Sequence, residues 1–384
     1  MSLHSQSRRH FMQGAAAAGG LLAAPHLVLA RAATDRRFVF VIQRGAADGL
    51  NTVIPYAEPA YARLRGALAI DASAATQLDG SFALHPALVE TAKLYAAKEA
   101  LFVHAVASPY RDRSHFDGQN VLESGGSMPY ELKDGWLNRL VALLPKNHAE
   151  AIAITPTLPL ALRGQAATSS YAPSMAKQAP EDLLQRVQQL YEADAQLHAM
   201  WSAAMEARGM AGPALKQSPA ELGQLAARFL SQPDGPRIAM LETNGWDTHS
   251  AQLPRMANQL KALDALIAAL RDGLGTAWAD TTVLVATEFG RTVAANGTNG
   301  TDHGTASVAM LLGGAVQGGR VLGDWPGLAP SALYQGRDLQ PTANLDVLIA
   351  CATAECFGLE PERVTRALFP QAARAAPLPR LLRA

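Results

Sequence analysis

Acidic, imidazole and hydroxyl side chains gather in a few short segments of the sequence, and these residue types suit metal binding. Asp247 and His249 form an Asp-x-His pair in NGWDTHS, and His303 follows a glycine-rich stretch. Carboxylate oxygen and imidazole nitrogen are ligands that Zn²⁺ and similar cations accept, so we expect these three residues to bind one metal ion. The alternatives are that Asp247 or Thr248 only caps the following helix, and that His303 is a solvated loop residue.

Two further carboxylates follow apolar runs and are candidate metal ligands. Glu288 ends the run TTVLVAT, and Asp48 lies in a glycine-flanked loop after FVFVI. A carboxylate at the end of a buried strand is costly unless it is paired or bound to a metal. An internal ion pair with Arg291 would also satisfy Glu288, and Asp48 before Gly49 is also typical of a turn.

Ser114 and its neighbours indicate group transfer. Ser114 precedes a predicted helix over His115–Glu123, where a hydroxyl could attack a phosphoryl or sulfuryl centre. His115 is a candidate for proton transfer. Ser114 is explained equally well as an ordinary N-cap.

Arginine side chains could hold the transferred oxyanion with two hydrogen bonds each. Surface charge is the alternative for any one of them. The candidates are Arg44, Arg111, Arg113 and Arg291.

Short apolar runs alternate with longer helical patterns, which predicts an α/β fold with a mostly parallel central sheet flanked by helices. The polar segments lie at the ends of the predicted strands, and ligands bind outside the carboxyl ends of such strands. We therefore expect one composite site. The predicted strands are Phe38–Ile42, Leu101–Val106, Ala151–Ile154, Arg237–Leu241, Thr282–Ala286 and Ser307–Leu312. The predicted helices are Leu84–Ala97, Glu181–Arg208, Pro219–Phe229, Ala251–Arg271 and Ala343–Cys356.

Composition and missing motifs exclude several classes of protein. The 384 residues carry 33 Lys+Arg and 33 Asp+Glu, so the formal net charge of zero gives no electrostatic footprint for nucleic acid. A hydrophobic fraction of 49% excludes a disordered chain. The sequence has no nucleotide-binding loop of the G-x-x-x-x-G-K-[ST] type, no G-x-S-x-G elbow and no H-E-x-x-H motif.

The first 32 residues are predicted to be a twin-arginine signal peptide. Arg8 and Arg9 lie in SRRHFM, a weakly apolar run follows, and Ala30-Arg31-Ala32 fits a cleavage site. The alternative, a membrane anchor, needs about 20 apolar residues, and Pro25 interrupts a shorter run. We expect passage through the twin-arginine translocase to the periplasm or the medium, no stable membrane span, and a single domain over residues 36–384.

Together these segments resemble a known bacterial family. VFVIQRGAADGLNTVIPY, RSHFDGQNVLESG, NGWDTHS, TEFGRT and TDHGTASVAMLLGG, behind a twin-arginine leader, are similar to an uncharacterised exported family of unknown function, DUF1501. That family is grouped with the alkaline phosphatase/sulfatase-like superfamily, and the resemblance covers essentially the whole mature chain. It implies an alkaline phosphatase/sulfatase-like fold.

The resemblance also implies roles for single residues. Asp48 is similar to the first metal-binding Asp of the superfamily, and Ser114 to its nucleophile. Glu288 replaces the Asp, and Phe289 the His, of an Asp-His motif. His303 is similar to the late metal-binding His. A competing alignment places Asp302 and His303 on the Asp-His motif itself.

The resemblance implies an exported metal-dependent hydrolase of phosphate or sulfate esters. Its cofactor would be a divalent metal, Zn or one of Mn, Ca and Mg, and a small ester would be the substrate. The alternative is a non-catalytic exported binding or assembly protein that keeps the scaffold.

Overall fold

A nine-stranded sheet lies at the centre of the computed structural model, with β1 (Arg37–Gln43) near its middle. The strand order is β11–β5–β10–β9–β1–β8–β6–β7, and β12 pairs with β5. The other strands are β5 (Ala100–Ala107), β6 (Ala151–Ala153), β7 (Thr168–Ser170), β8 (Ile238–Thr243), β9 (Thr281–Thr287), β10 (Ser307–Leu312), β11 (Arg320–Leu322) and β12 (Ala343–Asn344). The sheet is mostly parallel, as predicted, because within it only β10 runs antiparallel to its neighbours, β9 and β5.

The structure describes residues 35–145, 151–172, 181–192, 194, 196–202, 205, 218–372 and 378–383. The predicted signal peptide, residues 1–32, lies outside them, as does part of the helix predicted over Glu181–Arg208, where α7 covers Glu181–Tyr191. Of the two compact units in the chain, Met1–Arg31 is therefore not described, and Ala32–Ala384 holds the sheet. The single domain over residues 36–384 stays a prediction.

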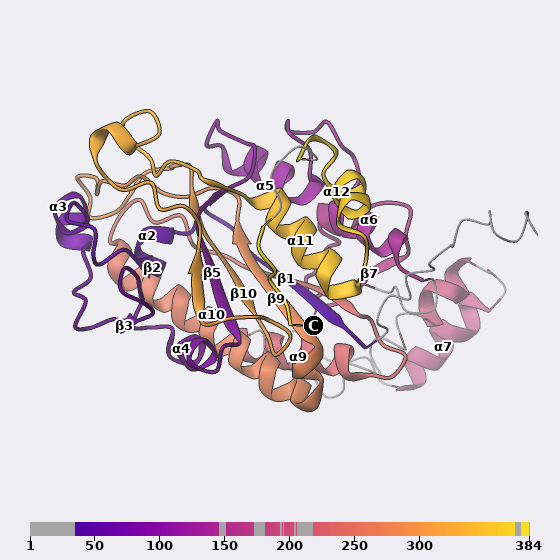
Figure 1. Cartoon of the computed structure of the whole chain (residues 1–384). Coiled ribbons are helices and arrows are strands. Elements are labelled where there is room, and N and C mark those ends of the chain that lie inside the picture. Colours follow the sequence, from indigo (N-terminus) through magenta and orange to yellow (C-terminus); the bar gives the residue numbers. More distant parts are fainter. Residues whose placement is uncertain are drawn as a thin grey trace, which may run out of the picture. The chain divides into compact units, whose positions relative to one another are not determined.

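Helices cover both faces of the sheet because side chains along a strand alternate between the faces. In β1, Phe38, Phe40 and Ile42 pack into one buried cluster, and Val39 and Val41 pack into another. The first face carries α5 (His115–Ser124), α6 (Trp136–Leu143), α11 (Leu345–Phe357) and α12 (Pro361–Leu368). The second carries α4 (Val89–Ala96), α9 (Pro219–Ser231) and α10 (Gln252–Leu274). Figure 1 shows the two helical layers above and below the sheet.

All six predicted strands are confirmed, whereas two helix predictions are wrong at their starts. The helix predicted over Ala343–Cys356 begins only at Leu345, because Ala343–Asn344 is the strand β12. Ala83–Leu84 is the short strand β4 of a second sheet, with β2 (Val53–Ile54) and β3 (Thr76–Gln77), and α4 begins only at Val89. Pro86 gives the reason, since the residue before a proline is disfavoured in helical conformation. Among the helices that the structure describes, none combines the length and apolar character needed to cross a membrane.

Candidate metal centre

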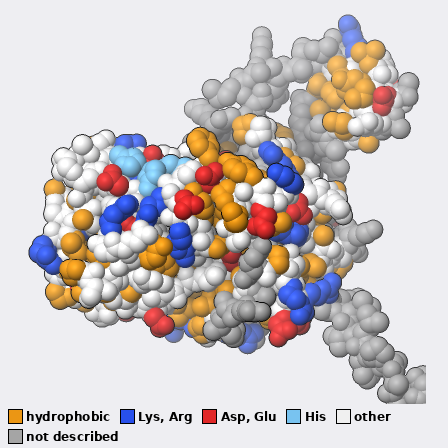
Figure 2. Space-filling model, turned by 90° about the horizontal axis from the view of Figure 1, so that it is seen from above, with side chains coloured by type: hydrophobic (Ala, Val, Ile, Leu, Met, Phe, Trp, Pro, Cys, Tyr) orange, Lys and Arg blue, Asp and Glu red, His pale blue; other side chains and the backbone are white. Residues whose placement is uncertain are grey.

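Three imidazole rings converge on one carboxylate at the edge of the central sheet. Nε2 of His249 lies 3.0 Å and Nε2 of His303 3.3 Å from Oδ1 of Asp247, and Nε2 of His115 lies 3.4 Å from Oδ2. The two nitrogens Nε2 of His249 and His303 are 3.0 Å apart. We call these four residues the histidine–aspartate cluster. In Figure 2, histidine side chains lie together at the surface that faces upward in Figure 1.

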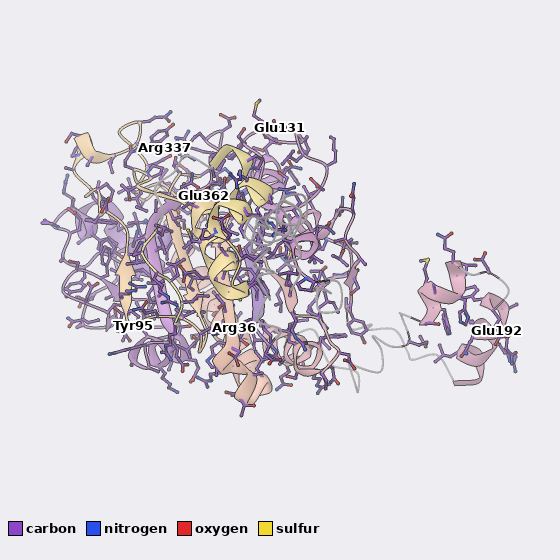
Figure 3. The ribbon with its side chains drawn as sticks, turned by 45° about the vertical axis from the view of Figure 1, so that its right-hand side comes forward. Arg36, Tyr95, Glu131, Glu192, Arg337 and Glu362 are labelled. Carbon is purple, nitrogen blue, oxygen red and sulfur yellow. The ribbon has the colours of Figure 1, made fainter. Side chains whose placement is uncertain are left out.

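The sheet topology explains why residues distant in the sequence meet here. His115 begins α5 after β5, and Asp247 and His249 lie between β8 and α10. His303 precedes β10, and because β10 is antiparallel its start lies at the edge where the parallel strands end. Figure 3 shows Arg337, whose guanidinium donates to the His303 carbonyl, at the opposite side of the molecule from Arg36, just before β1. The prediction of one composite site at the carboxyl ends therefore fits this topology.

Two glycines allow the segment before β10 to come close to the segment after β9. A Cβ on Gly290 would lie 1.9 Å from the carbonyl oxygen of Ala306, and one on Gly304 would lie 2.3 Å from the carbonyl carbon of Arg291. Arg291 and His303 form an antiparallel bridge between the two segments. Any side chain at either glycine would push the segments apart and move His303.

The second ring nitrogen of each histidine is held by an oxygen atom. Nδ1 of His115 lies 2.9 Å from Oε1 of Glu288, and Nδ1 of His303 lies 2.8 Å from the Arg113 carbonyl oxygen. Nδ1 of His249 lies 3.1 Å from Oδ1 of Asp302. When each Nδ1 carries the proton, each Nε2 presents a lone pair, which is the arrangement that orients histidines toward a metal.

Glu288 is fully buried and supports the ring of His115. Its Oε1 accepts hydrogen bonds from the backbone N–H of Gly45 at 2.8 Å and from Nε2 of Gln119 at 3.1 Å, in addition to His115. Burial alone would raise the pKa of Glu288, but the hydrogen bonds from His115 and Gln119 outweigh it and hold the pKa below its usual value. The same hydrogen bond from His115 to Glu288 raises the pKa of His115.

Arg291 anchors the carboxylate at the centre of the cluster. Its side chain is 1% exposed, Nη1 donates to Oδ1 of Asp247 at 2.7 Å, and Nε donates to Oγ1 of Thr301 at 3.1 Å. Burial raises the pKa of Asp247, and the Arg291 guanidinium more than reverses this, so the net shift is downward. Asp247 therefore stays a charged acceptor for the surrounding nitrogens.

The structure does not bring Asp48 to the cluster. Both carboxylate oxygens face the guanidinium of Arg65, at 2.5 and 2.9 Å, and Oδ2 also accepts from Nε2 of Gln252 at 2.5 Å. Asp48 and Arg65 are 2% and 0% exposed. Gln252 in turn accepts from Thr301, which contacts Arg291, so Asp48 lies behind the cluster and supports it from within.

The arginines expected to hold an oxyanion are engaged by the protein. Arg111 donates to backbone carbonyls of Ser108 and Tyr110, and Arg113 donates to Asp338 at 2.9 Å. Arg291 is the anchor of Asp247. Arg113 and Arg291 are thus paired with carboxylates of the protein, and Arg111 is held by backbone carbonyl oxygens through Nη1.

Ser114 directly precedes His115 at the start of α5. Its side chain makes no capping hydrogen bond, and its backbone N–H donates to Oη of Tyr110 at 3.1 Å. Ser114 therefore occupies the N-cap position of α5, as its alternative interpretation predicts, but without the side-chain hydrogen bond of a cap, and its nucleophile role stays a prediction.

The donor set fits a divalent cation of the borderline class. One atom each from His115, Asp247 and His303 lie within 4.8 Å of one another. Nε2 of His115 is buried without a hydrogen-bond partner among the described residues, which is the state of a nitrogen that faces a cation. Ligands of a tetrahedral Zn²⁺ lie about 3.3 Å apart, close to the separations around Asp247.

The sequence predicts a proton-transfer role for His115 and did not identify it as a possible metal ligand. Its position just after Ser114, at the start of a helix that follows a strand, was the available signal. It also assigned Glu288 and Asp302 directly to the metal, whereas the structure places each behind a histidine, at Nδ1 of His115 and of His249.

Comparison with known proteins identifies the family. Residues 35–366 match the family model described as "Protein of unknown function (DUF1501)", and the chain belongs to this family. No curated protein matches the chain.

Several solved structures are distantly similar to the chain. The C-terminal periplasmic domain of EcEptC from Escherichia coli, in complex with Zn, is 11% identical over 73% of this chain and 74% of that one, with a TM-score of 0.37. A phosphonate monoester hydrolase of Agrobacterium radiobacter is 10% identical over 75% and 70%, with a TM-score of 0.35. A putative sulfatase from Bacteroides thetaiotaomicron is 9% identical over 85% and 71%, with a TM-score of 0.39.

Proposed function

We propose that this member of the DUF1501 family binds a divalent cation of the Zn²⁺ class in the histidine–aspartate cluster and hydrolyses a phosphate or sulfate ester. His115, Asp247 and His303 would hold the cation, with His249 beside them. When bound, such a cation polarises an ester oxygen and neutralises the charge that builds on it.

One observation carries the proposal: Nε2 of His249 and Nε2 of His303 lie 3.0 Å apart, although each ring has an oxygen atom at its other nitrogen. With both Nδ1 atoms protonated, the two lone pairs repel each other and the negative charge of Asp247. A cation between them converts this repulsion into attraction. All three histidines have an oxygen atom at Nδ1, and this supports the same conclusion. A hydrogen bond at the nitrogen that does not bind the metal is typical of metal-binding histidines.

The remaining roles belong to residues of the chain itself. Ser114 is the proposed nucleophile, since it directly precedes a cluster histidine and its hydroxyl makes no capping bond. Glu288 keeps the ring of His115 oriented, and Arg291 keeps Asp247 charged and in place.

Metal content tests the binding step. The mature protein, purified without chelator, should hold about one equivalent of metal by elemental analysis, and His115→Ala and His303→Ala should each lose most of it. His198→Ala, an exposed histidine outside the cluster, is the matched control and should keep the metal. Absence of metal from the wild-type protein after incubation with Zn²⁺ and Mn²⁺ would contradict the proposal.

Turnover of 4-nitrophenyl phosphate and 4-nitrophenyl sulfate tests the chemical step. We expect Ser114→Ala to abolish turnover while metal content stays unchanged, because Ser114 acts on the substrate. Turnover equal to wild type in Ser114→Ala would remove the nucleophile assignment.

A second candidate function is metal binding without turnover, as in a binding or assembly protein. The engagement of Arg111, Arg113 and Arg291 by protein groups favours it, because Arg113 and Arg291 are already paired with carboxylates and Arg111 is held by backbone carbonyl oxygens. A full complement of metal with no turnover of either ester would select this candidate.

We further propose export by the twin-arginine route. Arg8 and Arg9 in SRRHFM support it. Replacement of both by Lys should leave the precursor in the cytoplasm, whereas wild-type protein should fractionate with the periplasm.

A further inference from the structure

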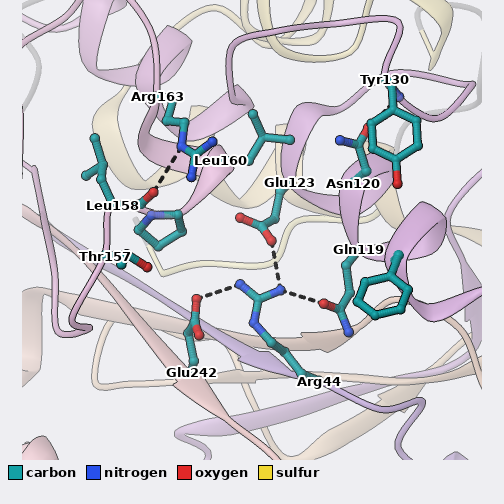
Figure 4. Close-up of a pocket in the computed structure, with 12 residues that line it drawn as sticks. Arg44, Gln119, Asn120, Glu123, Tyr130, Thr157, Leu158, Leu160, Arg163 and Glu242 are labelled. Atoms are coloured by element: carbon teal, nitrogen blue, oxygen red, sulfur yellow. Dashed lines mark hydrogen bonds and ion pairs between the residues drawn. The ribbon is translucent and has the colours of Figure 1, made fainter.

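A pocket opens beside the histidine–aspartate cluster, between α5 and the segment 157–163. Its volume is ≈ 400 Å³, within the range of small-molecule sites. Figure 4 shows its two walls, with Gln119, Glu123 and Tyr130 on one side and Leu158 and Arg163 on the other.

The floor of this pocket carries charges that neutralise one another. Arg44 donates to Glu123 at 2.8 Å, to Glu242 at 2.5 Å and to Gln119 at 3.0 Å. With Arg163, the charged lining comprises two arginines and two glutamates. A pocket without net charge, in which the guanidinium at the floor is already paired, favours a neutral ligand over a second anion.

The polar lining offers both donors and acceptors. Asn120 presents an amide, and Glu242 presents a carboxylate oxygen beyond the one bound to Arg44, whereas both polar atoms of the Gln119 amide are bound to Arg44 and Glu288. Hydroxyl groups both donate and accept, so a polyhydroxylated ligand satisfies such a lining better than an apolar one.

Two aromatic side chains that line the pocket are exposed to solvent. Phe116 is 82% and Tyr130 is 54% exposed, and both line it. An exposed aromatic face costs free energy unless a ligand covers it, and the C–H face of a sugar ring stacks on aromatic rings.

The pocket is physically joined to the cluster through one helix. His115, Gln119 and Glu123 recur every four residues and so lie along one face of α5, about 6 Å apart per step. Gln119 also donates to Glu288, which holds His115. A molecule bound at the cluster would therefore extend along α5 into the pocket.

We propose that this pocket binds a neutral saccharide group of the substrate, so that the ester hydrolysed at the cluster is a sugar ester. The inference rests on the proposed function for the ester itself. Sugar binding in the pocket does not depend on the metal, and the two can be tested apart.

The experiment is an array of neutral and anionic oligosaccharides probed with the mature protein, followed by calorimetric titration of the glycan that binds best. We expect binding of a neutral saccharide that persists in EDTA. Phe116→Ala and Tyr130→Ala should each weaken it about tenfold, the worth of one stacked aromatic contact. Met128→Ala, equally a large exposed apolar residue but outside the pocket, is the matched control and should bind as wild type.

Several results would overturn the inference. These are no retained saccharide, retention of anionic glycans alone, or unchanged affinity in both aromatic variants. Loss of metal or of ester turnover with saccharide binding intact would instead defeat the proposed function and leave the saccharide site standing.

Discussion

Oε1 of Glu288 lies 2.9 Å from Nδ1 of His115, and this contact turns the other nitrogen of the ring toward Asp247. The carboxylate is itself fixed by the backbone of Gly45 and by Gln119. A buried residue after β9 thus sets the orientation of a ring at the start of α5. Rotation of the ring would break its hydrogen bond to this buried carboxylate.

Glu288→Gln should weaken metal binding by about ten- to a hundredfold, the usual effect of changing a second contact of a ligand histidine. The amide would present an N–H group that competes with the His115 N–H for the same space. Competition with a chelating dye measures the affinity, and nitrogen NMR of the imidazole should report a changed tautomer. Exposed Glu131→Gln is the control, and equal affinity in both variants would contradict the role of Glu288.

Arg291→Lys should lower the free energy of unfolding by about 1.5–3 kcal/mol, the worth of a hydrogen bond to a charged group, because Arg291 is buried whereas the Asp247 side chain is 43% exposed. Lysine cannot reproduce the fork that contacts both Asp247 and Thr301. Urea unfolding measures the loss, and exposed Arg366→Lys should change stability by less than about 0.5 kcal/mol. The pKa of Asp247 should rise in Arg291→Lys, and an unchanged pKa would show that the guanidinium does not control it.

Asp48→Asn should destabilise the fold yet leave metal content unchanged. The reason is that Asp48 faces Arg65 and Gln252, and the variant leaves a buried guanidinium unpaired, which costs about 3–5 kcal/mol. Elemental analysis at a temperature where the variant is folded gives the metal content. Replacing Asp48 and Arg65 together by apolar residues should recover part of the stability. Loss of metal in folded Asp48→Asn would restore the sequence-based assignment of Asp48 as a ligand.

Stability should fall as the pH drops from about 6.5 toward 4, in part because of His104. Burial lowers the pKa of His104 to about 4 from 6.5, and its Nδ1 accepts from the Ala105 N–H while Nε2 faces the Val53 carbonyl oxygen, so the ring is neutral. The unfolded chain therefore binds a proton that the folded chain excludes, and the stabilisation, about 3 kcal/mol, is present above pH 6.5 and lost by pH 4.

Chemical unfolding at pH 7 and pH 4.5 tests this contribution. His104→Gln should show a smaller difference between the two pH values than the wild type, by about 2–3 kcal/mol. Exposed His198→Gln should retain the wild-type difference. An identical difference in His104→Gln would show that another group causes the acid sensitivity.

The fold class and the segments of the candidate metal centre could be predicted from the sequence. Short apolar runs such as TTVLVAT and SVAMLL predict strands of a sheet that is covered on both faces. The side chains on both sides of such a strand are buried, so its sequence is apolar throughout. The NGWDTHS and TDHG segments were recognisable because each combines Asp and His, two residue types that bind metal ions.

Which of these residues meet depends on long-range packing. The antiparallel direction of β10, which no local pattern encodes, brings His303 to the edge where β5, β8 and β9 end. Asp48 and Glu288 look alike in sequence, each a carboxylate after an apolar strand. Asp48 pairs with Arg65 and lies away from the cluster, whereas Glu288 contacts His115 and supports the cluster. A carboxylate's role depends on the charge that lies opposite it after folding, and that partner is fixed by long-range packing.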